Sequence, residues 1–166
     1  MLRGERVELR PLAEADLPRL LEILAEPEVR AWWGDYDEAR LRRDYLSDEG
    51  DTGLTLVALG EVVGMIGYWE EKEPDGRHAG MDIFVATARH GDGLAQDALR
   101  TLARHLIDER GHHRLVIDPA VANERAIRAY EKAGFRRVGV MRRAQRLPGG
   151  DWHDILLMEM LADELG

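Results

Sequence analysis

The chain has 166 residues, no cysteine, and 32 acidic against 23 basic side chains, which gives a formal net charge of -9. This length suits one domain spanning 1–166, and 45% apolar with 33% charged residues is typical of a folded globular chain. No apolar run approaches the roughly 20 residues that span a bilayer, and the charged first residues do not read as a signal peptide, so we expect a cytoplasmic protein. The missing cysteine excludes disulfides, a thiolate nucleophile and a thiolate metal site.

The acidic balance also bears on the partners of the protein. An excess of negative charge disfavours nucleic acid and anionic membranes and favours a cationic partner, although the same charge also keeps a protein in solution. We therefore expect no nucleic-acid partner and no membrane partner. The composition is compatible with either a monomer or a homodimer.

The first half of the sequence predicts a strand, two helices and three strands. Residues 7–10 alternate and end at Pro11, which is typical of a strand. The dipeptide Gly60-Glu61 between two strand-like runs predicts a two-residue hairpin. In chain order these elements are a strand at 7–10, a helix over 17–24, a second helix from Asp37, and strands at 55–59, 62–68 and 80–85.

The second half predicts a helix, a strand, a helix and two strands. Apolar residues from Leu94 to Leu106 lie on one helical stripe, and Gly111 is a stop signal for that helix. Asn123 can cap the next helix, which ends at Gly134. The strands in this half are at 115–117, around 138–141 and at 155–160. This order predicts an α/β domain around a mixed, largely antiparallel sheet.

A glycine-containing segment, Arg-His-Gly-Asp-Gly-Leu-Ala at 89–95, links a strand to the long helix. Glycines allow backbone N–H groups to approach a phosphate closely, and a helix N-terminus adds roughly half a positive charge. Two glycines before a helix are more often a plain turn, and no Gly-Lys-Ser/Thr follows as in a Walker loop. The segment by itself therefore indicates a phosphate site only weakly.

The helix from Asn123 strengthens this indication. Asn123, Ile127 and Tyr130 are spaced to share one helix face, and the helix ends at Gly134-Phe135. Together with the glycine segment and the element order, this arrangement resembles the GNAT acetyltransferase superfamily. The resemblance implies a GNAT-like α/β fold in which helices flank both faces of the sheet. It also implies one N-acetyltransferase domain that uses acetyl-CoA and no metal.

The resemblance assigns roles to residues of this chain. The glycine segment would bind the pyrophosphate of acetyl-CoA, Asn123 would lie along the cofactor arm, and Tyr130 would protonate the departing thiolate. Backbone N–H groups around Phe84 and Val85 would polarise the thioester carbonyl. The implied cofactor-binding residues are Phe84, Val85, His90, Gly91, Gly93, Leu94, Ala95, Asn123, Ala126 and Tyr130.

Two positions depart from the family's pattern in the phosphate loop. His90 stands where Arg or Gln usually opens the loop, and Asp92 stands where a basic or neutral residue is usual. A carboxylate that faces a pyrophosphate is unfavourable by about 1 kcal/mol when solvated. Backbone amides do not depend on side-chain identity and can still hold the cofactor, so the departure bears on the tightness of cofactor binding and not on the fold.

Several stretches narrow the resemblance to the aminoglycoside 6'-N-acetyltransferase branch of the superfamily. They are residues 29–34, 69–75 and 81–86 and the pair Asp118-Pro119. The branch implies a primary amine of an aminoglycoside-like molecule as acceptor, and with it antibiotic resistance. Alternatives are a siderophore-lysine acceptor or a protein N-terminus, and, from another class, a non-catalytic module that binds or senses acyl-CoA.

Two carboxylates suit an amine acceptor, which is protonated at pH 7 and must lose a proton before it attacks. Asp82 lies within a predicted strand, where a charge needs a partner, and it can bind the ammonium and act as general base. The alternative is an exposed strand residue or a structural ion pair. Asp118 is the second carboxylate, or else a turn residue before Pro119. The resemblance puts both in the acceptor site.

Trp32 and Trp33 lie in the predicted connection between the first two helices. Their rings can stack on a sugar or cover a cationic amine. Because adjacent residues point apart, we expect one to lie in the core and Trp33 to face the site. The acidic loop at 70–75 is either a solvated face or an attractor for a cationic substrate.

Two other chemistries are disfavoured by the sequence. The six histidines show no spacing typical of metal ligands, so we expect no metal site. Ser47, the only serine, lacks the Gly-x-Ser-x-Gly context of a nucleophile. Without cysteine an acyl-cysteine intermediate is impossible, so acetyl transfer would be direct.

Overall fold

The computed structural model describes residues 1–166. None of its helices is both long and apolar enough to cross a membrane. The helices and strands in chain order are β1 (Leu2–Arg3), β2 (Glu8–Pro11), α1 (Leu17–Leu24), α2 (Pro27–Trp33), α3 (Glu38–Tyr45), β3 (Thr52–Ala58), β4 (Glu61–Glu71), β5 (His78–Val85), α4 (Leu94–Asp108), β6 (Arg114–Ile117), α5 (Glu124–Ala133), β7 (Arg136–Arg146) and β8 (Trp152–Leu161).

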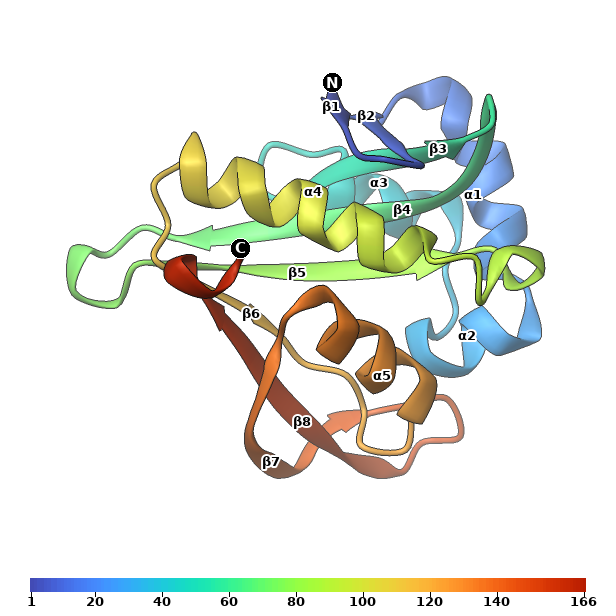
Figure 1. The fold of residues 1–166 in the computed structure, drawn as a ribbon. Coiled ribbons are helices and arrows are strands. Elements are labelled where there is room, and N and C mark those ends of the chain that lie inside the picture. The colour runs from blue at the N-terminus through green and yellow to red at the C-terminus, as the bar shows by residue number, and fades with distance from the viewer.

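All eight strands belong to one sheet, in the order β1-β2-β3-β4-β5-β6-β8-β7. Neighbouring strands are antiparallel except β5 and β6, which run parallel. Helices α4 and α5 cover one face of the sheet, and α1 to α3 cover the other (Figure 1). The predicted fold class, a mixed and largely antiparallel sheet flanked by helices on both faces, is therefore confirmed.

Each face of the sheet has its own apolar core. Leu99 and Leu102 of α4 pack with Met81 of β5 in the larger cluster. Leu20 of α1 and Leu41 of α3 pack in the smaller cluster on the opposite face. Leu102 lies on the apolar stripe that the sequence predicts from Leu94 to Leu106. Burial of the apolar helix faces holds both helical layers against the sheet.

Three local predictions are wrong. The sequence predicts neither β1 nor α2, and α2 includes Trp32 and Trp33, which were expected in a connection. Seven residues with a single buried position show no helical period, so α2 leaves little trace in the sequence. The β3–β4 turn uses Leu59 and Gly60, both with positive φ, instead of Gly60-Glu61. Such a turn requires positive φ at both central residues, which glycine adopts readily and leucine does not.

The sheet opens between β5 and β6. The two strands pair only at Ala79 with Leu115 and at Gly80 with Val116. From Asp82 onward β5 has a strand partner only in β4. Figure 1 shows the two strands diverging beyond this point, with α4 and α5 on either side of the opening. One edge of the second half of β5 is therefore free.

Peptide groups alternate between the two edges of a strand, so one contact fixes which of them face the opening. The Ala86 N–H donates to the Val63 carbonyl in β4 at 2.7 Å. Phe84 lies two residues before Ala86, so its N–H and C=O groups point toward β4 as well. The N–H groups of Ile83 and Val85 face the opening.

Candidate active site

Two cavities meet beside the free edge of β5. One, of about 300 Å³, lies between residues 89–96 and α5, and we call it the glycine-loop cavity. The other, of about 540 Å³, lies between α2, α3 and strands β5 to β8, and we call it the carboxylate cavity because Asp82 and Asp118 line it. The residues that line both are Trp32, Trp33, Ile83, Asn123 and Tyr130. The molecule thus has two compartments with one junction.

The glycine-loop cavity brings four predicted residues together at the start of α4. Gly91 and Gly93 have φ of 86° and 78°, the left-handed region that favours glycine. Leu94 and Ala95 open the helix and line the same cavity. The first N–H groups of a helix have no acceptor within it, so this end of the cavity offers donors to an anion.

Basic side chains that the sequence analysis did not single out also line the glycine-loop cavity. Four of them line it, together with a single acidic side chain, that of Glu28. Three of the four follow at i, i+3 and i+7 on α5, so helical spacing is the signal that could have found them. They are Arg89, Arg125, Arg128 and Lys132. Within a chain of charge -9, this cavity suits a polyanion.

His90 ties three elements together at the edge of this cavity. Its Nε2–H donates to the Val85 carbonyl at 2.8 Å, so its Nδ1 is the acceptor for the Arg125 guanidinium. Arg125 in turn lies 3.4 Å from the Glu28 carboxylate. The unusual histidine of the loop therefore links β5, α5 and α2 through side chains.

The carboxylate of Asp92 is paired with a basic side chain and does not line the glycine-loop cavity. Its carboxylate lies 3.2 Å from Arg89 Nε, and its carbonyl accepts from Arg6 Nη1 at 2.6 Å. Asp92 is not among the residues that line the cavity. The repulsion that the sequence suggested is therefore not directed at this site.

Asp82 carries a carboxyl without a partner on the wall of the carboxylate cavity. Its side chain is half-buried and makes no hydrogen bond or ion pair within the chain. Burial first, and then the carboxylates of Asp118 and Asp51, raise the pKa of Asp82 to about 7. Burial also raises the pKa of Asp118. A carboxyl that titrates near neutral pH can accept a proton from a bound group.

Tyr130 stands at the junction of the two cavities. Its side chain is buried, and its hydroxyl has no hydrogen-bond partner in the chain. Burial, followed by the charges of Asp82 and Asp118, raises its pKa, so the phenol is protonated at neutral pH. Asn123 caps the same helix, since its Oδ1 accepts from the Ala126 N–H at 3.4 Å. The arrangement offers a proton acceptor on one side of the junction and a proton donor at it.

The two tryptophans do not divide into one core residue and one site residue. Both are half-buried and both line both cavities, so the expectation that one is buried in the core is wrong. At the end of a helix, adjacent side chains are close enough to flank one junction. Trp33 packs edge-on against Phe84, with ring centroids 5.0 Å apart. Phe84 lines the glycine-loop cavity, but of the predicted strand residues it is Val85 whose peptide N–H faces the opening.

The acidic loop lies outside both cavities. Of residues 69–75 only Trp69 lines either cavity. Glu70 instead accepts from Arg110 and is bonded to the buried His112, both at 2.6 Å. These contacts join β4 to the segment before β6.

Comparisons with known proteins agree with this geometry. The profile of the acetyltransferase (GNAT) domain family matches residues 6–136. Aminoglycoside N(6')-acetyltransferase type 1 of Klebsiella pneumoniae is 34% identical over 158 residues, which cover 83% of this chain and 78% of that protein. The alignment therefore includes most of both chains.

Two solved structures illustrate the likeness in fold. A GNAT-family acetyltransferase from Bacillus anthracis superposes with a TM-score of 0.84 at 20% identity and covers 98% of this chain and 99% of that one. The aminoglycoside acetyltransferase AAC(6')-Ib in complex with coenzyme A and kanamycin superposes with a TM-score of 0.77 at 28% identity, covering 95% of this chain and 96% of that one.

Proposed function

The chain belongs to the GNAT acetyltransferase family, and we propose that it moves the acetyl group of acetyl-CoA to a primary amine of an aminoglycoside-like molecule. The observation that carries the proposal is the unpaired carboxyl of Asp82, which lies beside the junction of a basic and an acidic cavity. A polyanionic donor suits the first cavity, and a cationic acceptor suits the second. The two substrates would then meet at Tyr130.

The residues of the glycine-loop cavity fit acetyl-CoA in charge. Gly91 and Gly93 shape a loop that ends at a helix N-terminus, which suits the pyrophosphate. Arg125, Arg128 and Lys132 suit the remaining phosphate charge. The free edge of β5 supplies peptide groups at Ile83 and Val85 for the acyl end. Asp92 offers no opposing charge, because its carboxylate is paired with Arg89.

Lys132→Glu is expected to raise the Kd of acetyl-CoA about tenfold, because it reverses a charge on the wall that would face the phosphates. Titration calorimetry at low and high salt measures the change, and salt should reduce it. The matched control is Lys72→Glu, since these are the only two lysines and Lys72 lies in the exposed loop after β4. Equal weakening by both variants would contradict the assignment of this cavity to the donor.

Direct transfer at this site removes two protons from the amine nitrogen and adds one to the leaving thiolate. Asp82 takes a proton from the bound ammonium and passes it to water, and the free amine forms the new N–C bond as the C–S bond breaks. Tyr130 gives its proton to the leaving thiolate and regains one from the acetylated nitrogen. The peptide N–H groups of Ile83 and Val85 would stabilise the negative charge on the thioester oxygen. Overall the reaction releases one proton.

An aminoglycoside-like acceptor is supported by the walls of the carboxylate cavity and by the named relatives. Six aromatic side chains line this cavity, and their rings suit the faces of sugar rings. The carboxylates of Asp82 and Asp118 suit ammonium groups. The aromatic residues on this wall are Trp32, Trp33, Tyr36, Tyr45, Trp69 and Tyr130.

A screen of thiol release from acetyl-CoA tests the acceptor. The acceptors are kanamycin, hydroxylysine and peptides with free N-termini, with each product identified by mass. We expect kanamycin to give the highest kcat/KM and acetylation at one amine. Reaction with peptides alone, or with hydroxylysine alone, would replace the aminoglycoside assignment. Tight acetyl-CoA binding without thiol release on any amine would favour a sensing module.

A further inference from the structure

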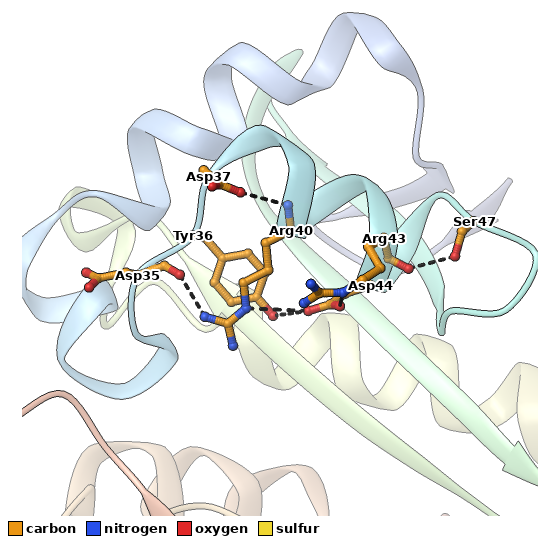
Figure 2. Close-up of polar contacts among 7 residues, drawn as sticks. All are labelled: Asp35, Tyr36, Asp37, Arg40, Arg43, Asp44 and Ser47. Carbon is orange, nitrogen blue, oxygen red and sulfur yellow. Dashed lines mark hydrogen bonds and ion pairs between the residues drawn. The ribbon is translucent and has the colours of Figure 1, made fainter. Parts of the chain in front are cut away.

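Arg40 is the only basic residue that lines the carboxylate cavity. It belongs to α3, which Asp37 caps by accepting the Arg40 N–H at 2.8 Å (Figure 2). A cation on the wall of a cavity that also holds Asp82 and Asp118 is unexpected if the cavity receives an amine. The contacts of its side chain explain how this charge is held there.

The Arg40 guanidinium is held by three contacts on one side of the cavity. Its Nη1 donates to the Asp35 carbonyl at 2.7 Å, and its Nε lies 3.7 Å from the Asp44 carboxylate. Its central carbon lies 4.0 Å from the centroid of the Tyr36 ring. The Tyr36 hydroxyl donates to the same Asp44 carboxylate at 2.9 Å, which fixes the ring under the guanidinium. The orientation of Arg40 is thus set before any ligand binds.

One terminal nitrogen of Arg40 is left without a partner. Figure 2 shows this nitrogen pointing away from Asp35 and Asp44, the residues that hold the other two. A guanidinium carries only donors, so the free N–H groups can bind an oxygen but not a protonated amine. The carboxylate cavity therefore has an acidic side at Asp82 and Asp118 and a donor side at Arg40.

We propose that Arg40 determines acceptor specificity: it binds an oxygen of the acceptor, hydroxyl or carboxylate, while Asp82 receives the reacting amine. A second ammonium on the α3 side would meet a fixed like charge and lose its hydration without compensation, so linear polyamines are rejected. The inference rests on the proposed function, because it names the class of amine that the same cavity accepts. Amino sugars and other amines with an oxygen at the far end satisfy it.

Three amines of matched length test the role of Arg40: aminopentanol, aminopentanoate and cadaverine. With wild-type protein we expect kcat/KM for the better of the two oxygen-bearing amines to exceed that for cadaverine by about tenfold or more. The alcohol and the acid distinguish a hydroxyl from a carboxylate as the bound group. Arg40→Met should bring the three values to within about twofold of each other. Arg40→Lys should keep the rejection of cadaverine, because it keeps the charge.

Arg43→Met is the matched control for the same measurement. Arg43 lies on the same helix and contacts the same Asp44 carboxylate at 3.0 Å, but it does not line the cavity. The wild-type order of the three amines should survive in this variant. An order that Arg40→Met leaves unchanged, or that Arg43→Met abolishes equally, overturns the proposal.

Failure of the proposed function has a separate signature. If none of the three amines releases thiol, the same ratios are taken from dissociation constants measured on the protein saturated with coenzyme A. Absent turnover on every amine tested, kanamycin included, would contradict the proposed function. Equal dissociation constants, or no binding of any of the three, would contradict the role of Arg40.

Discussion

Asp82→Asn is expected to lower kcat by about 100-fold or more, because the amide keeps the size of the side chain but cannot accept a proton. Asp82 lines the carboxylate cavity and not the glycine-loop cavity. The Kd of acetyl-CoA should therefore stay at its wild-type value and serve as an internal reference. Thiol release at saturating acetyl-CoA measures the first quantity, and calorimetry measures the second.

Asp51→Asn is the matched control for this change. Burial raises the pKa of Asp51 as well, yet Asp51 lines neither cavity. The control should retain turnover. Wild-type turnover in Asp82→Asn would remove Asp82 from the role of base. Equal losses in both variants would instead assign the effect to the summed field of the acidic groups.

The pH dependence of the wild-type reaction is linked to the same carboxyl. Since the pKa of Asp82 is about 7, kcat/KM should rise with pH and level off above that value. Repulsion by Asp118 is one cause of the raised pKa. Asp118→Asn should therefore shift the rising limb to lower pH, and a limb that does not move would show that it belongs to another group.

Asp82→Asn should lower activity but raise stability, so the stability of the variant provides a second readout of the same carboxyl. The folded-state pKa of about 7 lies above the ordinary value of 3.8, so the charged carboxylate destabilises the fold at alkaline pH. This penalty shrinks as the pH falls below 7 and is small at pH 4, close to the unfolded-state pKa of 3.8. After a discount for partial solvent access, the variant should gain about 2 kcal/mol in free energy of unfolding at pH 8. Urea unfolding at pH 8 and at pH 4 checks the sign.

Those parts of the fold that bury a periodic apolar face were predictable from the sequence. Helix α5 shows both a cap at Asn123 and a stop at Gly134, and the glycines of the loop before α4 have positive φ, as their residue type suggests. Helix α2 buries only Val29 and so shows no stripe. The opening between β5 and β6 depends on how two strands diverge, which no local pattern encodes.

The candidate site also combines residues that the sequence singles out with residues that only the fold reveals. Asp82 and Tyr130 stand out in the sequence, one as a charge within a strand and the other by its helical spacing. Arg40 and Lys132 do not, because 21 arginines and two lysines give no reason to select these two until the fold brings them to a cavity wall. The pairing of Asp92 with Arg89 is likewise set by the fold, because the side-chain partner decides whether the carboxylate opposes an anion.

Tyr130→Phe is expected to lower kcat by about 100-fold, because it removes the only phenol at the junction of the two cavities and keeps the ring. The hydroxyl has no partner within the chain, so its loss leaves no buried group unsatisfied, and the midpoint of thermal unfolding should stay close to the wild-type value. The Kd of acetyl-CoA should also change little.

Tyr45→Phe separates loss of the proton donor from loss of a cavity phenol. Tyr45 is buried, lines the carboxylate cavity and carries a pKa raised chiefly by burial and then by Asp82, but it does not line the junction. Its variant should keep most of the turnover. If the two variants lost turnover equally, a general effect of the phenols on Asp82 would explain both. If Tyr130→Phe kept its turnover, water would be the source of the proton for the thiolate.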